Sequence, residues 1–193
     1  MKKIITLTGA SGAGKTTLCH HLLPELNAVE LVSHTTRSPR AGEKEGVTYH
    51  FVSDKVFDTL AKIECTEYAG NRYCLAEEAL SDIPDNGIGI IVVDQHGVDC
   101  LADYCAQHQG TYILLPIFLQ IDEDCSRERM LSRGDNPESI QRRIQQQRDK
   151  HEYTPDHPER YNLILDSYNL ADIPNNVKLI KALLHLEVAL RCG

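Results

Sequence analysis

Apolar runs alternate with helical patterns along most of this chain. The apolar runs predict buried strands at residues 3–8, 88–93, 112–121 and 161–165. The segments between and after them predict helices at residues 16–26, 97–108, 123–133, 138–150 and 174–190. Largely apolar strands that alternate with helices are typical of a parallel sheet covered by helices on both faces. The pattern therefore predicts an α/β fold of this kind.

Two segments interrupt the alternation. Residues 31–75 are rich in Thr, Arg, Gly, Glu and Tyr and contain short alternating runs, which predict a small antiparallel insertion. Residues 127–148 carry six of the eleven arginines and are therefore positively charged, although the whole chain has a net charge of −8. We expect one core that carries two inserted parts.

Composition narrows the classes of function. A chain of 193 residues with 41% hydrophobic and 25% charged residues is typical of one globular domain. Its negative charge argues against general affinity for nucleic acid or an anionic membrane, but a local basic cluster can still bind a small anion. No apolar run is long enough for a signal peptide core or a membrane span. The seven cysteines include no C-x-x-C pair. They predict reduced thiols in a cytoplasmic protein and argue against a zinc site. We expect a monomer or a homodimer.

A glycine-rich segment follows the first predicted strand and opens the first predicted helix. It matches G-x-x-x-x-G-K-[ST], a loop whose backbone N–H groups bind the phosphates of a nucleoside triphosphate. The residues expected to bind ATP are Gly9, Ala10, Ser11, Gly12, Ala13, Gly14, Lys15, Thr16 and Thr17. Lys15 is expected to reach the β- and γ-phosphates, while Thr16 and Asp94, at the end of another predicted strand, are expected to ligate Mg²⁺.

A longer and more specific string lies in the first interrupting segment. Residues 33–43 read SHTTRSPRAGE and are followed by Gly46 and by YHFV at residues 49–52. On this string the sequence resembles the guanylate kinase family. The resemblance continues through Glu64, Gly70, Asn71, Arg72, Tyr73, Asp94, Gly97, the run from Arg129 to Gly134, and the run from Ile140 to Arg143.

The resemblance implies a P-loop NTPase core with a parallel sheet and helices on both faces. It implies a core of residues 1–31, 76–125 and 146–193, an insertion at 32–75 that binds the nucleoside monophosphate, and a helical lid at 126–145. The implied reaction is transfer of the γ-phosphoryl group of ATP to GMP or dGMP, with Mg²⁺ as cofactor and the two nucleotides as the partners.

The resemblance also implies roles for individual residues. Arg37, Arg40, Tyr49 and Tyr73 would hold the acceptor phosphate, with Ser33 close to the nucleotide. Arginine forks bind phosphate through two hydrogen bonds, which agrees with this assignment. The charges expected to stabilise the transferred phosphoryl group are those of Lys15, Arg37, Arg129, Arg133 and Arg143.

Base recognition is where the sequence departs from the family. Glu64 matches one of two carboxylates that read guanine, but Val92 stands at the position of the second and Leu75 at that of a hydroxyl. An unpaired buried polar group costs about 1–3 kcal/mol, so the two apolar positions would weaken the binding of guanine. The sequence therefore leaves open which base the acceptor nucleotide carries. Two alternatives follow: the same transfer to another (deoxy)nucleoside monophosphate or a phosphorylated sugar, or a non-catalytic module that binds a phosphorylated ligand. The intact phosphate loop argues against the second.

Overall fold

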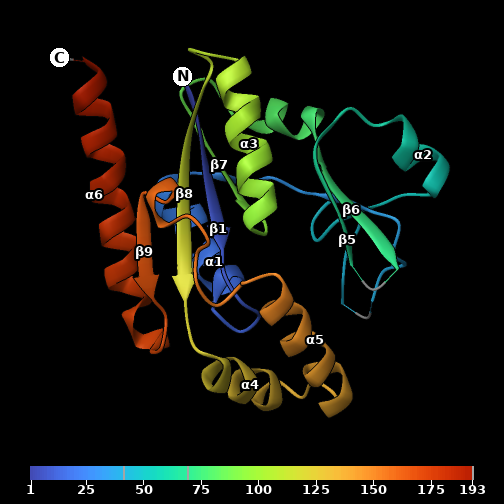
Figure 1. The fold of residues 1–193 in the computed structure, drawn as a ribbon. Coiled ribbons are helices and arrows are strands. Elements are labelled where there is room, and N and C mark those ends of the chain that lie inside the picture. Colours follow the sequence, from blue (N-terminus) through green and yellow to red (C-terminus); the bar gives the residue numbers. More distant parts are fainter. Residues whose placement is uncertain (41, 69, 193) are drawn as a thin grey trace.

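The computed structural model describes residues 1–40, 42–68 and 70–192, and its centre is a five-stranded parallel sheet (Figure 1). In spatial order the strands are β2 (Val29–Glu30), β7 (Ile88–Val92), β1 (Lys2–Thr8), β8 (Tyr112–Gln120) and β9 (Leu163–Asp166). Every neighbouring pair in this sheet is parallel, which confirms the predicted sheet. The two-residue β2 is too short for the apolar pattern to reveal, and β9 begins two residues later than predicted.

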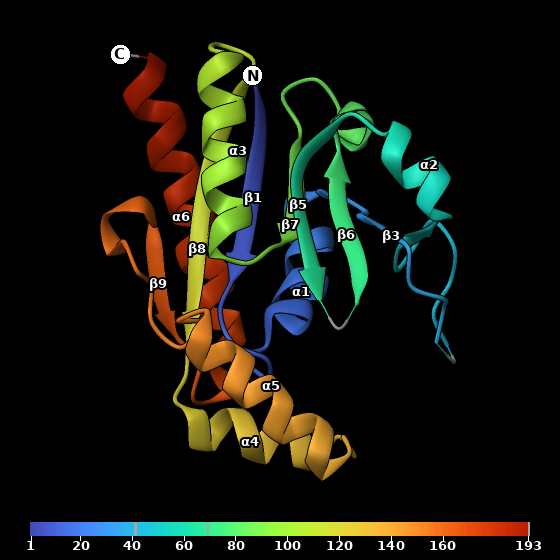
Figure 2. The same ribbon diagram turned by 45° about the vertical axis from the view of Figure 1, so that its right-hand side comes forward.

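Helices cover both faces of this sheet. The three that do so are α1 (Lys15–Leu26), α3 (Gln95–Gln107) and α6 (Ile173–Cys192). Ile5 and Leu7 of β1 pack with α1 and α6, whereas Ile4 packs with α3, because successive side chains of a strand point to opposite faces. The sheet therefore separates α6 from α3 (Figure 2).

A second sheet lies beside the first. Its strands, in spatial order, are β4 (His50–Phe51), β3 (His34–Thr35), β6 (Asn71–Ala76) and β5 (Lys62–Tyr68). β6 pairs antiparallel with β3 and with β5, whereas β3 and β4 are parallel, a pairing the sequence did not predict. A short helix, α2 (Asp54–Thr59), packs Phe57 into this part of the molecule.

Two helices lie at the carboxyl end of the central sheet: α4 (Glu123–Ser132) and α5 (Pro137–Asp149) (Figures 1 and 2). The side chains of Asp122 and Asn136 cap their N-termini by accepting from backbone N–H groups. Met130 of α4 packs with Ile140 and Ile144 of α5, so the two helices share a small core. Three short 3₁₀ helices complete the fold: Glu77–Asp82, Pro158–Arg160 and Leu170–Asp172.

Two further observations concern the described part of the chain. None of its helices combines the length and apolar character that a bilayer crossing requires. The six cysteines whose side chains are described are all free.

Candidate active site

The loop between β1 and α1 wraps around the side chain of Lys15. Gly9, Gly12 and Gly14 have φ angles of 136°, 83° and 86°, a region that favours glycine. At Gly9 there is also no room for a side chain, because a Cβ atom would lie 2.2 Å from the Leu119 carbonyl oxygen. Lys15 Nζ donates to the carbonyl oxygens of Gly9 and Ala10, at 2.5 and 2.9 Å. The lysine is therefore held over the loop whose N–H groups suit a phosphate.

Electrostatics around Lys15 favour the arrival of an anion. Burial lowers the pKa of Lys15 from 10.5 to about 8; Glu152 partly opposes this shift, and Arg133 adds to it. Burial also raises the pKa of Glu152, a residue that the sequence analysis did not single out. A partly desolvated ammonium group interacts strongly with a phosphate, because little water is left to compete.

Arg37 is the centre of a second polar cluster, on the second sheet. Its Nη1 and Nη2 atoms donate to the two carboxylate oxygens of Glu43, at 2.9 and 2.8 Å, and its Nε donates to the Tyr73 hydroxyl at 3.2 Å. Its guanidinium carbon also lies 5.6 Å from the ring centre of Tyr49. Glu43 additionally accepts from the backbone N–H of Arg40 at 2.7 Å. A carboxylate thus occupies the bidentate position that a phosphate would take.

A cavity of about 350 Å³ joins this cluster to the phosphate loop. The predicted site residues in its wall are Gly9, Ser11, Lys15, Ser33, Arg37, Arg40, Tyr49, Glu64, Tyr73, Val92, Asp94 and Arg143. They come from the carboxyl end of the central sheet, the start of α1, the second sheet with the segments that flank its strands, and α5. The fold therefore brings together groups that are up to about 130 residues apart in the chain.

The other predicted residues lie outside this wall. Thr16 and Thr17 are exposed on the first turn of α1. Leu75 is fully buried among Ile4, Leu31 and Ile91 in the core beside α3, so it does not face the cavity. The interpretation of Leu75 as a base-facing position is therefore corrected. Its side chain fills the junction between the two sheets instead.

Glu64 is the buried carboxylate of the cavity, and only 7% of its surface is exposed. Burial raises its pKa to about 7, and the nearby charge of Asp94 adds to the rise. The backbone N–H of Leu75 and the charge of Lys150 oppose it. Glu64 therefore changes its charge near neutral pH, and it is able to accept hydrogen bonds from a ligand once it is ionised.

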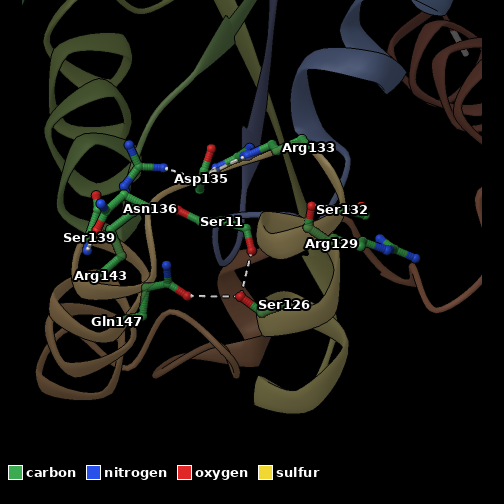
Figure 3. Close-up of polar contacts among 10 residues, drawn as sticks. All are labelled: Ser11, Ser126, Arg129, Ser132, Arg133, Asp135, Asn136, Ser139, Arg143 and Gln147. Carbon is green, nitrogen blue, oxygen red and sulfur yellow. Dashed lines mark hydrogen bonds and ion pairs between the residues drawn. The ribbon is translucent and has the colours of Figure 1, made fainter.

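Arg133 and Arg143 extend toward Asp135, whereas Arg129 extends away from it (Figure 3). Arg133 and Arg143 both pair with Asp135 Oδ2, at 2.6 and 3.1 Å. Arg129 instead donates to the carbonyl oxygens of Gly12, Ser167 and Tyr168, at 2.8, 2.6 and 2.8 Å. Its guanidinium therefore ties α4 to the outer side of the phosphate loop, whereas Arg143 faces the cavity.

Ser126 adds a second tie between α4 and this loop. Its hydroxyl donates to the Ser11 carbonyl oxygen at 2.7 Å and lies 3.4 Å from Gln147 Oε1 of α5 (Figure 3). Both helices are thereby anchored next to the phosphate loop. The arginine pair on Asp135 lies at their free end, where α4 leads into α5.

Both oxygens of Asp94, the predicted metal ligand, already have partners. Oδ1 accepts from the Gly97 N–H at 2.9 Å and caps α3, and Oδ2 pairs with Lys150 Nζ at 3.1 Å. No cluster of three or more His, Cys, Asp or Glu side chains suited to a metal occurs among the described residues. Nucleotide-bound Mg²⁺ takes most of its ligands from phosphates and water, so the exposed Thr16 hydroxyl fits such an ion. Asp94 fits only if Lys150 leaves its Oδ2.

Several groups in or beside the cavity were missed from the sequence. Glu43 was noted only as part of a motif, and Asp135, Lys150 and Glu152 were given no role. Lys150 and Glu152 lie directly after α5, at the start of a His-rich stretch that has no recognisable motif. Only their position in the cavity wall reveals them.

Comparison with known proteins places these observations in a family. The sequence model of the guanylate kinase family matches residues 1–183. A guanylate kinase of Neisseria meningitidis serogroup A is 38% identical over 152 residues, which are 75% of this chain and 72% of that protein. A guanylate kinase of Saccharophagus degradans is 34% identical over 143 residues, 71% of this chain and 67% of that protein.

The fold has a counterpart among solved structures. The crystal structure of guanylate kinase from Anaplasma phagocytophilum superposes with a TM-score of 0.67. The superposition covers 97% of this chain and 85% of that one, at 24% sequence identity. Both chains therefore share the same overall fold.

Proposed function

The chain belongs to the guanylate kinase family, and from this premise we propose that it transfers the γ-phosphoryl group of ATP to GMP and dGMP. It is a nucleoside monophosphate kinase, and its small-molecule partners are the two nucleotides. The observation that carries the proposal is the single cavity whose wall contains Lys15, Arg37 and Glu64. It offers a cation for the donor phosphates, an arginine fork for the acceptor phosphate, and a carboxylate for a base. We place the reaction in the cytoplasm, where free thiols stay reduced.

Each group has a distinct task in this proposal. The N–H groups of the phosphate loop hold the donor phosphates, and Lys15 stabilises the charge that develops as the γ-phosphoryl group is transferred. Arg37 and Arg40, with the hydroxyls of Tyr49 and Tyr73, hold and orient the acceptor phosphate. Positioning of this kind supplies much of the catalysis, because phosphoryl transfer needs little further chemistry from the protein.

The metal belongs to the donor nucleotide. Members of this family generally use a divalent metal, and we propose Mg²⁺, held by the Thr16 hydroxyl together with the phosphates. When bound, such an ion would supply positive charge that offsets the negative charge of the donor phosphates. For Asp94 to ligate Mg²⁺ as proposed, its contact with Lys150 must be released.

Residues 126–145 form the proposed lid over the core of residues 1–31, 76–125 and 146–193, facing the insertion at 32–75. In the structure Arg133 and Arg143 form ion pairs with Asp135 and lower the pKa of its carboxyl group. We propose that phosphate oxygens replace the Asp135 carboxylate when the lid closes, and that closure excludes water from the transferred group. Arg129 acts in this proposal by holding α4 to the phosphate loop, since its donors are used on backbone carbonyls.

The alternatives raised by Val92 and Leu75 are not favoured. The sequence model of the guanylate kinase family matches residues 1–183 of this chain. This match argues against both a different acceptor class and a non-catalytic module. The buried position of Leu75 also removes part of the reason for doubting guanine, because this side chain does not meet the ligand cavity.

A panel of acceptors tests the proposed function. We expect GMP and dGMP to have the highest kcat/KM among the common ribo- and deoxynucleoside monophosphates in a coupled assay with Mg²⁺ and ATP. A variant with Lys15 replaced by Met provides the background rate. Higher kcat/KM with another base, or binding of GMP without any transfer, would contradict the assignment.

Acidic conditions should weaken the use of GMP. Glu64 has a pKa of about 7, above its ordinary value, so the carboxylate that accepts from the base is lost as pH falls through 7. We expect kcat/KM for GMP to fall by about tenfold per unit below that pH. Glu64→Gln should remove this acid limb, whereas Glu67→Gln, at an exposed position of the same strand, should keep it. A flat profile between about pH 6 and pH 8 would rule out this role for Glu64.

A further inference from the structure

We infer that Lys150 is a specificity-determining residue for the acceptor base, and that its ammonium group donates a hydrogen bond to the base carbonyl adjacent to the N–H read by Glu64. This inference rests on the proposed function, because it names the part of the base that the same cavity recognises. It assigns a role to a residue for which the sequence offered none.

The position of Lys150 supports this role. It directly follows the last residue of α5, and its Nζ lies 3.1 Å from Asp94 Oδ2 and 3.5 Å from Thr66 Oγ1. Thr66 and Glu64 are two residues apart on β5 and both line the cavity, as Lys150 does. The ammonium group therefore lies in the cavity wall near Glu64, and its charge opposes the rise in the pKa of Glu64.

The backbone that carries Lys150 is fixed in this place. Gln95, at the start of α3, donates from Nε2 to the carbonyl oxygens of His151 and Thr154, at 2.9 and 3.3 Å. Its Oε1 accepts from the Asp156 N–H at 2.9 Å. Three hydrogen bonds from one side chain thus hold the segment after α5 against the core. A lysine on such a segment is pre-positioned at the cavity rather than mobile in solvent.

The two positions at which the sequence departs from the family supply no donor to the cavity. Leu75 is buried elsewhere and Val92, although it lines the cavity, has no polar atom. Lys150 has three N–H donors, and the structure uses two of them, on Asp94 and Thr66. One donor remains for a ligand, a second becomes available when the contact with Asp94 is released as proposed above, and 41% of the side chain is exposed.

An ammonium donor next to a carboxylate acceptor is complementary to guanine in a definite order. Guanine presents the O6 acceptor, then the N1–H donor and the N2 amino donor, along one edge. Adenine presents the reverse order, an amino donor at position 6 and an acceptor at N1. Because the phosphate and sugar fix the direction of a bound nucleotide, this order selects the base. The pair of Lys150 and Glu64 therefore favours a 6-oxopurine over a 6-aminopurine.

A change in the substrate itself tests the contact. In 6-thio-GMP a sulfur, which is a weak acceptor, replaces O6 while N1–H and the amino group remain. We expect the wild-type protein to prefer GMP over 6-thio-GMP in kcat/KM by about 10- to 100-fold, the range of a charge-assisted hydrogen bond. Lys150→Met should bring this ratio close to one, chiefly by lowering kcat/KM for GMP.

Matched variants separate base reading from structural support. Arg142→Met removes one positive charge from an exposed position of α5 and should leave the ratio as in the wild type. Lys150→Arg keeps the charge and the donors and should retain part of the preference. Ser33→Ala tests one of the hydroxyl-bearing side chains of the cavity wall, and it should have the smaller effect.

The outcomes distinguish this inference from the proposed function. If Lys150→Met lowers kcat/KM for GMP and 6-thio-GMP equally, Lys150 only supports the structure and the inference fails, while the kinase assignment stands. Loss of the preference in Ser33→Ala but not in Lys150→Met also overturns it, as does a wild-type protein that does not distinguish the two substrates. A wild-type protein that does not phosphorylate GMP overturns the proposed function and this inference together.

Discussion

Replacing Lys15 with methionine should slow turnover by about 100-fold or more, with little effect on folding. The Lys15 ammonium is buried, its pKa is lowered to about 8, and it sits on the carbonyl oxygens of Gly9 and Ala10. In the proposed reaction it stabilises the negative charge that increases on the donor phosphates in the transition state. Methionine keeps the length and the apolar contacts of the side chain but supplies no charge.

The measurement is kcat with saturating ATP, Mg²⁺ and GMP, together with the thermal midpoint of unfolding. Lys55→Met, at an exposed position of α2 outside the cavity, is the matched control and should turn over like the wild type. Turnover of Lys15→Met within a few fold of the wild type would exclude Lys15 from the catalytic charges.

Replacing Arg37 with methionine should lower kcat/KM for GMP by about 10²- to 10³-fold, because two charge-assisted hydrogen bonds to the acceptor phosphate are lost. The fork that would bind the phosphate is formed and oriented in the structure, held by Glu43 and by the Tyr73 hydroxyl. Arg37→Lys keeps the charge but not the fork, so it should recover only part of the loss.

Arg72→Met is the control for this experiment. Arg72 lies on the same sheet and pairs with Asp54 and Asp58 of α2, at 3.4 and 2.6 Å, away from the cavity. We expect it to leave kcat/KM for GMP nearly unchanged, and we expect KM for ATP to stay similar in both variants. If Arg37→Met and Arg72→Met behave alike, Arg37 is a surface charge rather than a phosphate ligand.

Locally determined features of this protein could be predicted from its sequence. The phosphate loop depends on three glycines with positive φ and on a helix that starts directly after them, so neighbouring residues specify it. Strand β1 and its partners were recognised because a strand buried on both faces must be apolar. The parallel pairing of β3 with β4 escaped prediction, since two residues carry too little pattern to indicate a partner.

Contacts between distant segments could not be predicted in the same way. Leu75 was expected to face a base, because the resemblance to the guanylate kinase family places a base-reading hydroxyl at that position. The junction of the two sheets turns its side chain into the core instead, where apolar contact stabilises it. Asp94 was expected to ligate Mg²⁺ together with Thr16, yet in the structure it pairs with Lys150, 56 residues later in the chain.

The sequence by itself determined the apolar pattern of the α/β core, the phosphate loop with Lys15, and the string around Arg37, because each depends on residues close together in the chain. The tertiary structure decided which charged groups meet. Glu43 binds Arg37, Asp135 binds Arg133 and Arg143, and Lys150 pairs with Asp94 in the cavity wall. The physical reason is that Coulomb interaction and burial depend on distance and solvent in three dimensions, which a one-dimensional spacing does not record.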